Sequence, residues 1–203
     1  MISLIIIGLV LLFVVFLLNF YRDPVRIAPP KSVCVAPADG KIMSVVPISQ
    51  FEHVIRKGIM GKVKANIQRL DKGGKAISIF MSPLDVHVNR MPMDGTIVSV
   101  THVRGPFGMA FHRERSWQNE HTHIVIQTDY GTVHLYQIAG FLARRIQTWV
   151  KPGQRVTKGE RIGRIVLGSQ VTIILPPTLT IAVTENQRVY AGQTIIAEET
   201  HAK

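Results

Sequence analysis

The sequence has little cysteine, few acidic residues and few aromatic residues. Its single thiol, Cys34, cannot form a disulfide within the chain or complete a multi-thiolate zinc site, so we expect a small core residue. Only 13 Asp and Glu stand against 24 Lys and Arg, which gives a formal charge of +11. Such an excess favours an anionic partner: a phospholipid surface, a nucleic acid or an acidic substrate.

The first 18 residues, MISLIIIGLVLLFVVFLL, lack any charged side chain. With residues 19–21 they are long enough to span a hydrocarbon core of roughly 30 Å as a helix. No charged stretch precedes this run and no small-x-small site follows it, which favours an uncleaved anchor over a signal peptide. Arg22, Arg26 and Lys31 follow at once. The positive-inside rule therefore predicts a cell-membrane protein whose main domain lies in the cytoplasm.

A basic domain tethered to a membrane is most simply explained by anionic lipid. Aromatic residues are sparse and no recognised nucleic-acid motif is present, so we do not expect nucleic acid as a partner.

The rest of the chain consists of short apolar runs between turn residues. We expect an anchor over residues 1–21, a proline-containing linker over 22–32 and one domain over 33–203. The predicted fold class is mainly β (α+β): a compact barrel-sandwich-like domain of short strands and hairpins, with one N-terminal transmembrane helix. Strands are predicted over 33–36, 41–48, 76–81, 96–100, 123–127, 132–138 and 171–175, and the strands over 123–127 and 132–138 are expected to form a hairpin around Asp129-Tyr130-Gly131. Hairpin or flap material is predicted over 51–75, a long loop over 104–120, and one short helix or turn within 139–149.

Two kinds of internal repetition support the β prediction. Gln-Arg-Val followed by glycine occurs at 154–159 and again at 187–192, which suggests two similar hairpin units folding against each other. Two Pro-x-Asp-Gly turns end in Gly40 and Gly95. Two roles are open for the carboxylates of Asp39 and Asp94. Either both only accept hydrogen bonds from nearby backbone and stabilise their turns, or one of them takes part in the chemistry of the site.

Gly168-Ser169 lies between an apolar run and a strand-like run. A Gly-Ser pair alone is an ordinary turn. In a strained turn, however, the Ser169 hydroxyl can attack the Gly168 carbonyl, and glycine permits the close approach. β-Elimination from the resulting ester and loss of ammonia would leave a pyruvoyl group. Such a ketone can form a Schiff base with a substrate amine and accept the electrons of a departing carboxylate.

That chemistry needs a base and a group to orient it. In an extended segment, the side chains of Asp85 and His87 would lie on the same face. His87 could then take the proton of Ser169 while a buried carboxylate holds the tautomer of its ring. His121 and His123 form half of a possible metal site, but no acidic or thiol ligand at supporting spacing completes it, so no metal is predicted.

Taken in order, these segments resemble the phosphatidylserine decarboxylase proenzymes, particularly the short bacterial and archaeal form. The resemblance runs from Phe20 to the C-terminus. The matching segments are 20–24, 37–40, 82–90, 119–120, 137–146 and 163–169.

The resemblance implies self-cleavage between Gly168 and Ser169, giving a large chain of 1–168 and a small chain of 169–203 that begins with the pyruvoyl group. Asp39 matches the family's cleavage-triad aspartate, and Ser169 matches its serine. The resemblance also implies that the substrate is a serine phospholipid, converted to the ethanolamine phospholipid and CO₂, and that the protein can self-associate.

The histidine assignment departs from the long forms of the family, which carry two histidines in this segment. His87 matches the first, and Arg90 stands in place of the second. Either His87 acts both as base in maturation and as proton donor in decarboxylation, or another histidine such as His123 takes one role. Arg90 and Arg144 are the candidates for holding the lipid phosphate.

The alternative from another functional class is a non-enzymatic, membrane-tethered barrel-sandwich module that binds or carries a ligand. Lipoyl and biotinyl carriers need a lysine at a hairpin tip, commonly within Met-Lys-Met. No such motif is present, which argues against this alternative.

Overall fold

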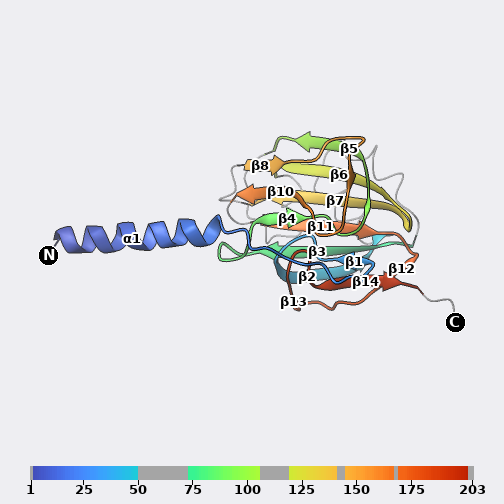
Figure 1. The fold of residues 1–203 in the computed structure, drawn as a ribbon, viewed down its shortest axis with the longest axis horizontal. Helices are drawn as coiled ribbons and strands as arrows, with labels where there is room; N and C mark the ends of the chain where they lie inside the picture. The colour runs from blue at the N-terminus through green and yellow to red at the C-terminus, as the bar shows by residue number, and fades with distance from the viewer. Residues whose placement is uncertain (1, 50–72, 106–118, 141–144, 167–168, 201–203) are drawn as a thin grey trace.

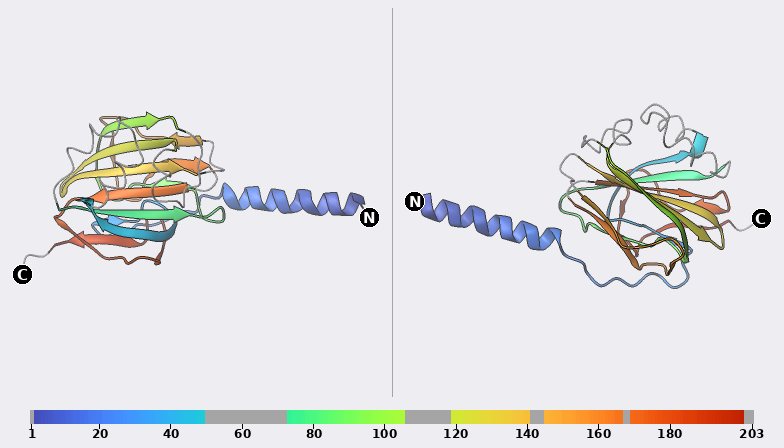
Figure 2. Two further views of the ribbon diagram at one scale, coloured as in Figure 1. Left: turned by 180° about the vertical axis from the view of Figure 1, so that it is seen from behind. Right: turned by 90° about the horizontal axis from the view of Figure 1, so that it is seen from above.

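The computed structural model describes residues 2–49, 73–105, 119–140, 145–166 and 169–200 of the 203-residue chain. One helix, α1 (Ile2–Phe20), projects from one end of a domain built from 14 described strands (Figure 1, Figure 2). All described strand pairs are antiparallel. The prediction of a mainly β fold with an N-terminal apolar helix is confirmed.

Helix α1 exposes apolar side chains along its length. Its span Ser3–Phe20 has a mean hydropathy of 2.9 and is only 6% buried, so α1 is not a core helix of the domain. Phe20 is the exception, because its side chain is buried against the domain. An apolar surface of this length suits a lipid environment.

The largest sheet has eight strands. Their order across the sheet is β13 (Arg188–Val189), β2 (Gly40–Pro47), β3 (Lys75–Met81), β11 (Ser169–Leu175), β7 (Gly131–Ala139), β6 (His121–Thr128), β5 (Gly95–Val103) and β9 (Arg155–Val156). Strand β11 therefore lies inside the sheet, hydrogen bonded to β3 on one side and to β7 on the other.

Two three-stranded sheets complete the domain. One has the order β4 (Val88–Arg90), β10 (Arg161–Val166), β8 (Arg145–Thr148), and the other has the order β1 (Cys34–Val35), β14 (Ile195–Glu199), β12 (Leu179–Ile181).

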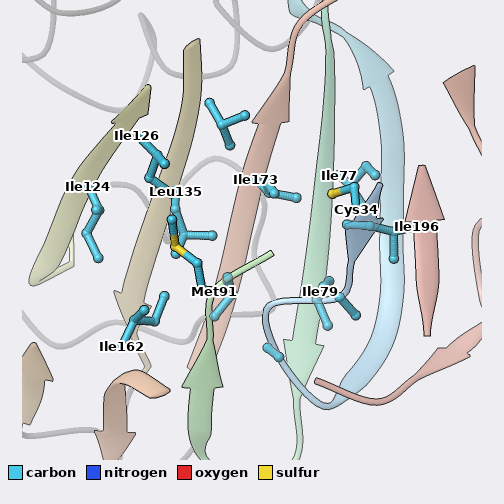
Figure 3. Close-up of a cluster of buried hydrophobic side chains, with 14 of the residues drawn as sticks. Cys34, Ile77, Ile79, Met91, Ile124, Ile126, Leu135, Ile162, Ile173 and Ile196 are labelled. Atoms are coloured by element: carbon cyan, nitrogen blue, oxygen red, sulfur yellow. The ribbon is translucent and has the colours of Figure 1, made fainter. Parts of the chain in front are cut away.

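The core contains apolar side chains from all three sheets (Figure 3). Ile79 and Ile173 come from the large sheet, Ile162 comes from β10, and Cys34 comes from β1. Cys34 is fully buried and burial raises its thiol pKa, so the expectation of an inert core residue is confirmed.

The two repeated units occupy equivalent places at the two edges of the large sheet. In one, Val156 pairs with Gly95; in the other, Val189 pairs with Gly40. A Cβ on Gly192 would lie 3.6 Å from the Cα of Gly159, so the two turns lie against each other. The two edges of the sheet therefore come together at these turns, which confirms the predicted packing of the two units against each other. The units are not hairpins, because β9 pairs with β5 and β13 pairs with β2.

The Asp-Gly turns repeat the same symmetry. Asp39 accepts a hydrogen bond from the Ala191 N–H at 2.8 Å, and Asp94 accepts one from the Lys158 N–H at 2.7 Å. Gly40 has φ +151°, and a Cβ there would lie 2.1 Å from the Phe80 carbonyl oxygen. Only glycine therefore allows β2 to approach β3 at this turn.

The prediction of a short helix or turn within 139–149 is wrong for residues 145–148, which form β8 and pair with β10. Residues 141–144 lie outside the described residues. Ile146 is buried between the exposed side chains of Arg145 and Gln147, and this period of two is that of a strand. The predicted hairpin around Asp129-Tyr130-Gly131 is confirmed as β6–β7. The flap and long-loop predictions fall largely on residues 50–72 and 106–118, outside the described residues.

Candidate active site

Ser169 is the first residue of the interior strand β11. Met81 and Ala139 lie directly across from it on β3 and β7. Its side chain is fully buried, and its hydroxyl donates to the Met81 sulfur at 3.2 Å. A thioether is a weak acceptor, so this hydroxyl is buried without a strong hydrogen bond among the described residues. Gly168 lies outside the described residues.

A chain of buried amides continues from Met81 across to the smaller sheet. Asn89 donates to the same sulfur at 3.7 Å, and Gln137 donates to the Asn89 side-chain oxygen at 2.8 Å. Thr148 donates to Gln137 at 3.1 Å. A Cβ on Gly163 would lie 2.9 Å from the Gln137 Nε2, so glycine leaves room for this amide. These contacts fix the two sheets relative to each other beside Ser169.

His87 is fully buried in the turn before β4. Its Nδ1 lies 2.8 Å from the Asp85 carbonyl oxygen. Because a carbonyl can only accept, Nδ1 carries the hydrogen and the neutral ring has its lone pair on Nε2. Nε2 is buried and has no hydrogen-bond partner in the described part of the chain. Burial lowers the pKa of His87 to about 4, so the ring is a neutral base near pH 7.

The Asp85 carboxylate does not orient His87. It accepts a hydrogen bond from the Ser82 N–H at 2.7 Å and pairs with Arg188. The expectation of a shared face assumed an extended segment, but Asp85 N–H also bonds back to the Ser82 carbonyl, which makes this segment a turn. The backbone of Asp85 therefore holds the His87 ring.

His87 and Ser169 belong to the same end of the domain. Strands β3 and β10 end on the side of α1, and β4 and β11 begin there (Figure 1). The Ile165 N–H, four residues before Ser169, donates to the His87 carbonyl oxygen at 3.3 Å. The last residue of α1, Phe20, stacks on the His87 ring with 4.2 Å between centroids.

Asp39 is held by an arginine from the segment after α1. Both carboxylate oxygens accept from Arg26, at 2.5 and 2.7 Å, and the pair is almost completely buried. Together with the Ala191 N–H, these contacts occupy the carboxylate, and none of its described contacts is with His87 or Ser169.

Arg90 also ties this segment to the domain. Its guanidinium pairs with Asp23 at 2.8 Å and donates to the carbonyl oxygens of Pro24 and Gly159. The side chain is 6% exposed, so these partners take up most of its donors. Arg144 lies outside the described residues.

His121 and His123 lie on the face of the large sheet opposite Ser169. The strand register aligns His123 with Tyr136 and Thr172, and Thr172 is three residues from Ser169 along β11. His123 Nε2 lies 3.0 Å from His134 Nδ1, and burial lowers its pKa to about 3. Among the described residues no three His, Cys, Asp or Glu side chains form a metal-binding group.

Comparison with known proteins decides the family. The family model for phosphatidylserine decarboxylase matches residues 13–197 of this chain. The chain belongs to this family. It is 42% identical over 185 residues to a Methanothermobacter thermautotrophicus protein whose name proposes an archaetidylserine decarboxylase proenzyme, covering 91% of this chain and 81% of the relative. It is 40% identical over 188 residues to the phosphatidylserine decarboxylase proenzyme of Chlorobaculum parvum, covering 92% and 80%.

A third relative, the phosphatidylserine decarboxylase proenzyme of Chlorobaculum tepidum, is 38% identical over 187 residues, covering 92% of this chain and 79% of the relative. Phosphatidylserine decarboxylases are made as proenzymes, and their pyruvoyl group derives from a serine of their own chain. The predicted family, enzyme class and self-derived cofactor are therefore confirmed.

Several residues around the site could not be assigned from the sequence. Asn89 and Gln137 lie within the matching segments, and their signal was a polar side chain inside an apolar strand. Met81 gave no signal, because it is an ordinary apolar residue in an apolar run. Phe20 and Arg164 also lie within matching segments, but their residue types, one aromatic beside an apolar run and one arginine in a basic chain, do not indicate a role at the site.

Proposed function

We propose that Ser169 is the pyruvoyl precursor of this phosphatidylserine decarboxylase, that the cut falls between Gly168 and Ser169, and that His87 serves both maturation and decarboxylation. The observation that carries this assignment is the state of His87: its Nδ1–H is held by the Asp85 carbonyl, and its buried Nε2 lone pair has no partner among the described residues.

In maturation, His87 takes the hydroxyl proton of Ser169 as the oxygen attacks the Gly168 carbonyl carbon. The peptide C–N bond breaks and an ester forms, with the amine of Ser169 released. Removal of the Ser169 α-proton then expels the carboxylate of Gly168 and leaves dehydroalanine. Water replaces its nitrogen, ammonia leaves, and the ketone remains. The weak contact of the hydroxyl with Met81 supports this role, because attack breaks no strong hydrogen bond.

The pyruvoyl group supplies an electron-withdrawing centre that binds the substrate amine and accepts the electron pair left by CO₂. The surroundings of Ser169 fit such a group, because the residue is fully buried and water would be kept from the electron-rich centre. In our proposal His87 takes up at Nε2 the proton that the substrate ammonium group gives up on binding, and then delivers it to the carbon that has lost CO₂. Asp39 supports maturation as a positioning residue, through Arg26 and the Ala191 N–H.

The substrate in this proposal is a serine phospholipid that enters from the bilayer. The relatives are named for both phosphatidylserine and archaetidylserine, whose phosphoserine head group is the same. Helix α1 anchors the protein in the cell membrane, and Arg22, Arg26 and Lys31 keep the domain on the cytoplasmic side. The position of Ser169 and His87 at the α1 end supports this arrangement. Self-association stays a prediction from the family.

Intact-mass measurement of the purified chain tests the assignment. We expect two chains cut between Gly168 and Ser169. The fragment 169–203 should lack a free amine, and on treatment with phenylhydrazine it should form a hydrazone at its new carbonyl, gaining the mass of the reagent less one water. Ser169→Ala should stay uncut, and His87→Gln should cut far more slowly. His102→Gln is the matched control, because His102 is partly exposed and contacts Thr122 and Glu120. Cleavage elsewhere, or normal cleavage of His87→Gln, would contradict the proposal.

A further inference from the structure

Arg164 is held between two aromatic rings rather than by an acid. Its guanidinium carbon lies 5.2 Å from the centroid of the Tyr21 ring and 6.0 Å from that of Trp149. These are cation–π distances. Its Nε is buried without a hydrogen-bond partner, and no hydrogen bond or ion pair joins the Arg164 side chain to any residue that the structure describes. The rings fix the position of the guanidinium while its donors stay available.

Other arginines around the same end already have acceptors. Arg26 pairs with Asp39, Arg90 and Arg161 share Asp23, and Arg188 pairs with Asp85. Arg22 donates to the carbonyl oxygens of Asn19 and Leu84. A guanidinium that is held in place but lacks an anionic partner is suited to an anion from outside the chain.

The position of Arg164 fits one part of the substrate. Arg164 lies opposite Val88 in the β10–β4 pair, next to His87 in sequence, and five residues before Ser169. The Arg164 charge also contributes to the lowered pKa of His87. Two aromatic rings connect Arg164 with His87. Phe20 packs against the His87 ring, and Tyr21, which lies beside Arg164, packs edge-on against Phe20 with 5.1 Å between ring centroids.

A serine phospholipid places its phosphate only a few bonds from the carbon that loses CO₂. A cation for that phosphate must therefore stand beside the proton donor, on the side where lipid enters. We infer that Arg164, clamped by Tyr21 and Trp149 at the end of α1, binds the phosphate of the serine phospholipid and so selects phosphoserine head groups. This inference rests on the proposed function. It assigns to Arg164 the phosphate-binding role that we predicted from the sequence for Arg90 and Arg144.

Steady-state kinetics with two substrates test the inference. One substrate is dioleoyl phosphatidylserine in mixed micelles, and the other is O-hexadecyl serine, which has the same amine and carboxylate but no phosphate. For Arg164→Gln we expect KM for phosphatidylserine to rise about 10- to 100-fold, as for loss of a charged hydrogen bond, and KM for the alkyl serine to change little. Arg164→Lys should raise KM for phosphatidylserine less, because lysine keeps the positive charge but lacks the paired N–H donors of the guanidinium.

Arg155→Gln is the control for net charge, since Arg155 is exposed on β9. An unchanged KM for phosphatidylserine in Arg164→Gln, or an equal change with both substrates, would overturn the inference. Wild-type protein that neither cuts itself nor gains a carbonyl would instead overturn the proposed function, so the two failures are distinguishable.

A binding measurement covers the case in which Arg164→Gln does not mature. Both proteins then carry Ser169→Ala, so that neither is cut, and Trp117→Phe, so that Trp149 is the only tryptophan. Titration with short-chain phosphatidylethanolamine should change Trp149 fluorescence, with affinity about 10- to 100-fold weaker when Arg164→Gln is added. Equal affinities would overturn the inference.

Discussion

The ring of Phe20 lies against the imidazole of His87, with 4.2 Å between centroids and 39° between the planes. Phe20 is the last residue of α1 and is 1% exposed, whereas most other side chains of the helix are exposed. The end of the proposed membrane anchor therefore forms one wall around the proposed catalytic base. Phe20 thus belongs to the proposed anchor and also contacts the proposed base, and substitution of Phe20 tests whether this contact matters for self-cleavage.

Phe20→Ala should disturb the site without releasing the protein from the membrane. The substitution removes a buried ring, which typically lowers the free energy of unfolding by about 3 kcal/mol. It also lets water reach His87, so the pKa of His87 should rise toward its ordinary value. Self-cleavage should then begin to slow at a higher pH than in the wild-type protein. The cleavage rate, measured from pH 4 to 8 for both proteins, tests this.

Phe13→Ala provides the comparison, because Phe13 lies on the same helix and is 59% exposed. It should leave both the cleavage rate and its pH dependence unchanged. If Phe20→Ala also keeps the wild-type pH profile, the contact with Phe20 does not control the solvation of His87.

Burial of neutral His87 predicts a dependence of stability on pH. Its pKa is about 4 in the folded protein against 6.5 as the ordinary value, so between these values the unfolded chain binds more protons. Stability should therefore fall as pH drops from 6.5 to 4, by on the order of 3 kcal/mol from this group. Urea unfolding of the uncut Ser169→Ala precursor in detergent measures it. Adding His87→Gln should make the dependence shallower; an identical slope would contradict the assigned burial.

The pair of Asp39 and Arg26 predicts that both partners matter alike for maturation. Breaking a buried pair leaves an uncompensated charge and typically costs about 3–5 kcal/mol. We expect Asp39→Asn and Arg26→Gln each to slow self-cleavage, measured by gel as the fraction of cut chain over time. Normal cleavage in Arg26→Gln beside a loss in Asp39→Asn would mean that Asp39 acts on the reacting groups directly.

Asp94→Asn is the matched control, because Asp94 occupies the equivalent turn and bonds the Lys158 N–H, with no arginine among its described partners. We expect it to cost no more than about 1 kcal/mol and to leave cleavage unchanged.

Much of the fold follows from local patterns in the sequence. The apolar run of residues 76–81 predicted β3, and the turn at Asp129-Tyr130-Gly131 predicted the β6–β7 hairpin. The repeated Gln-Arg-Val units predicted that their two turns pack against each other. The short helix or turn predicted within 139–149 was wrong for residues 145–148. Ala and Arg favour helices, but Ile146 is buried as β8 pairs with β10, and tertiary pairing outweighs a weak propensity.

The site was less accessible from the sequence. Ser169, His87 and Asp39 were singled out because serine, histidine and aspartate carry recognisable chemistry. The residues that hold these side chains could not be predicted from the sequence. The backbone carbonyl of Asp85, rather than its carboxylate, holds His87. Arg26, which holds Asp39, lies 13 residues away in a segment that we expected to be a linker. Contacts between distant segments depend on the complete fold, and residue type alone does not specify them.

The interior position of β11 has a consequence for the protein after it is cut. With the cut that we propose, the fragment 169–203 would supply β11 between β3 and β7, and β14 between β1 and β12, so it would contribute a middle strand to two sheets. The cut enzyme would then be two polypeptides that share the same sheets, and folding would have to precede cleavage. Once denatured, the two pieces would have to meet again by diffusion without the covalent link that first guided them. The mature enzyme should therefore lose activity irreversibly on heating, and its lifetime should be set by how slowly it unfolds.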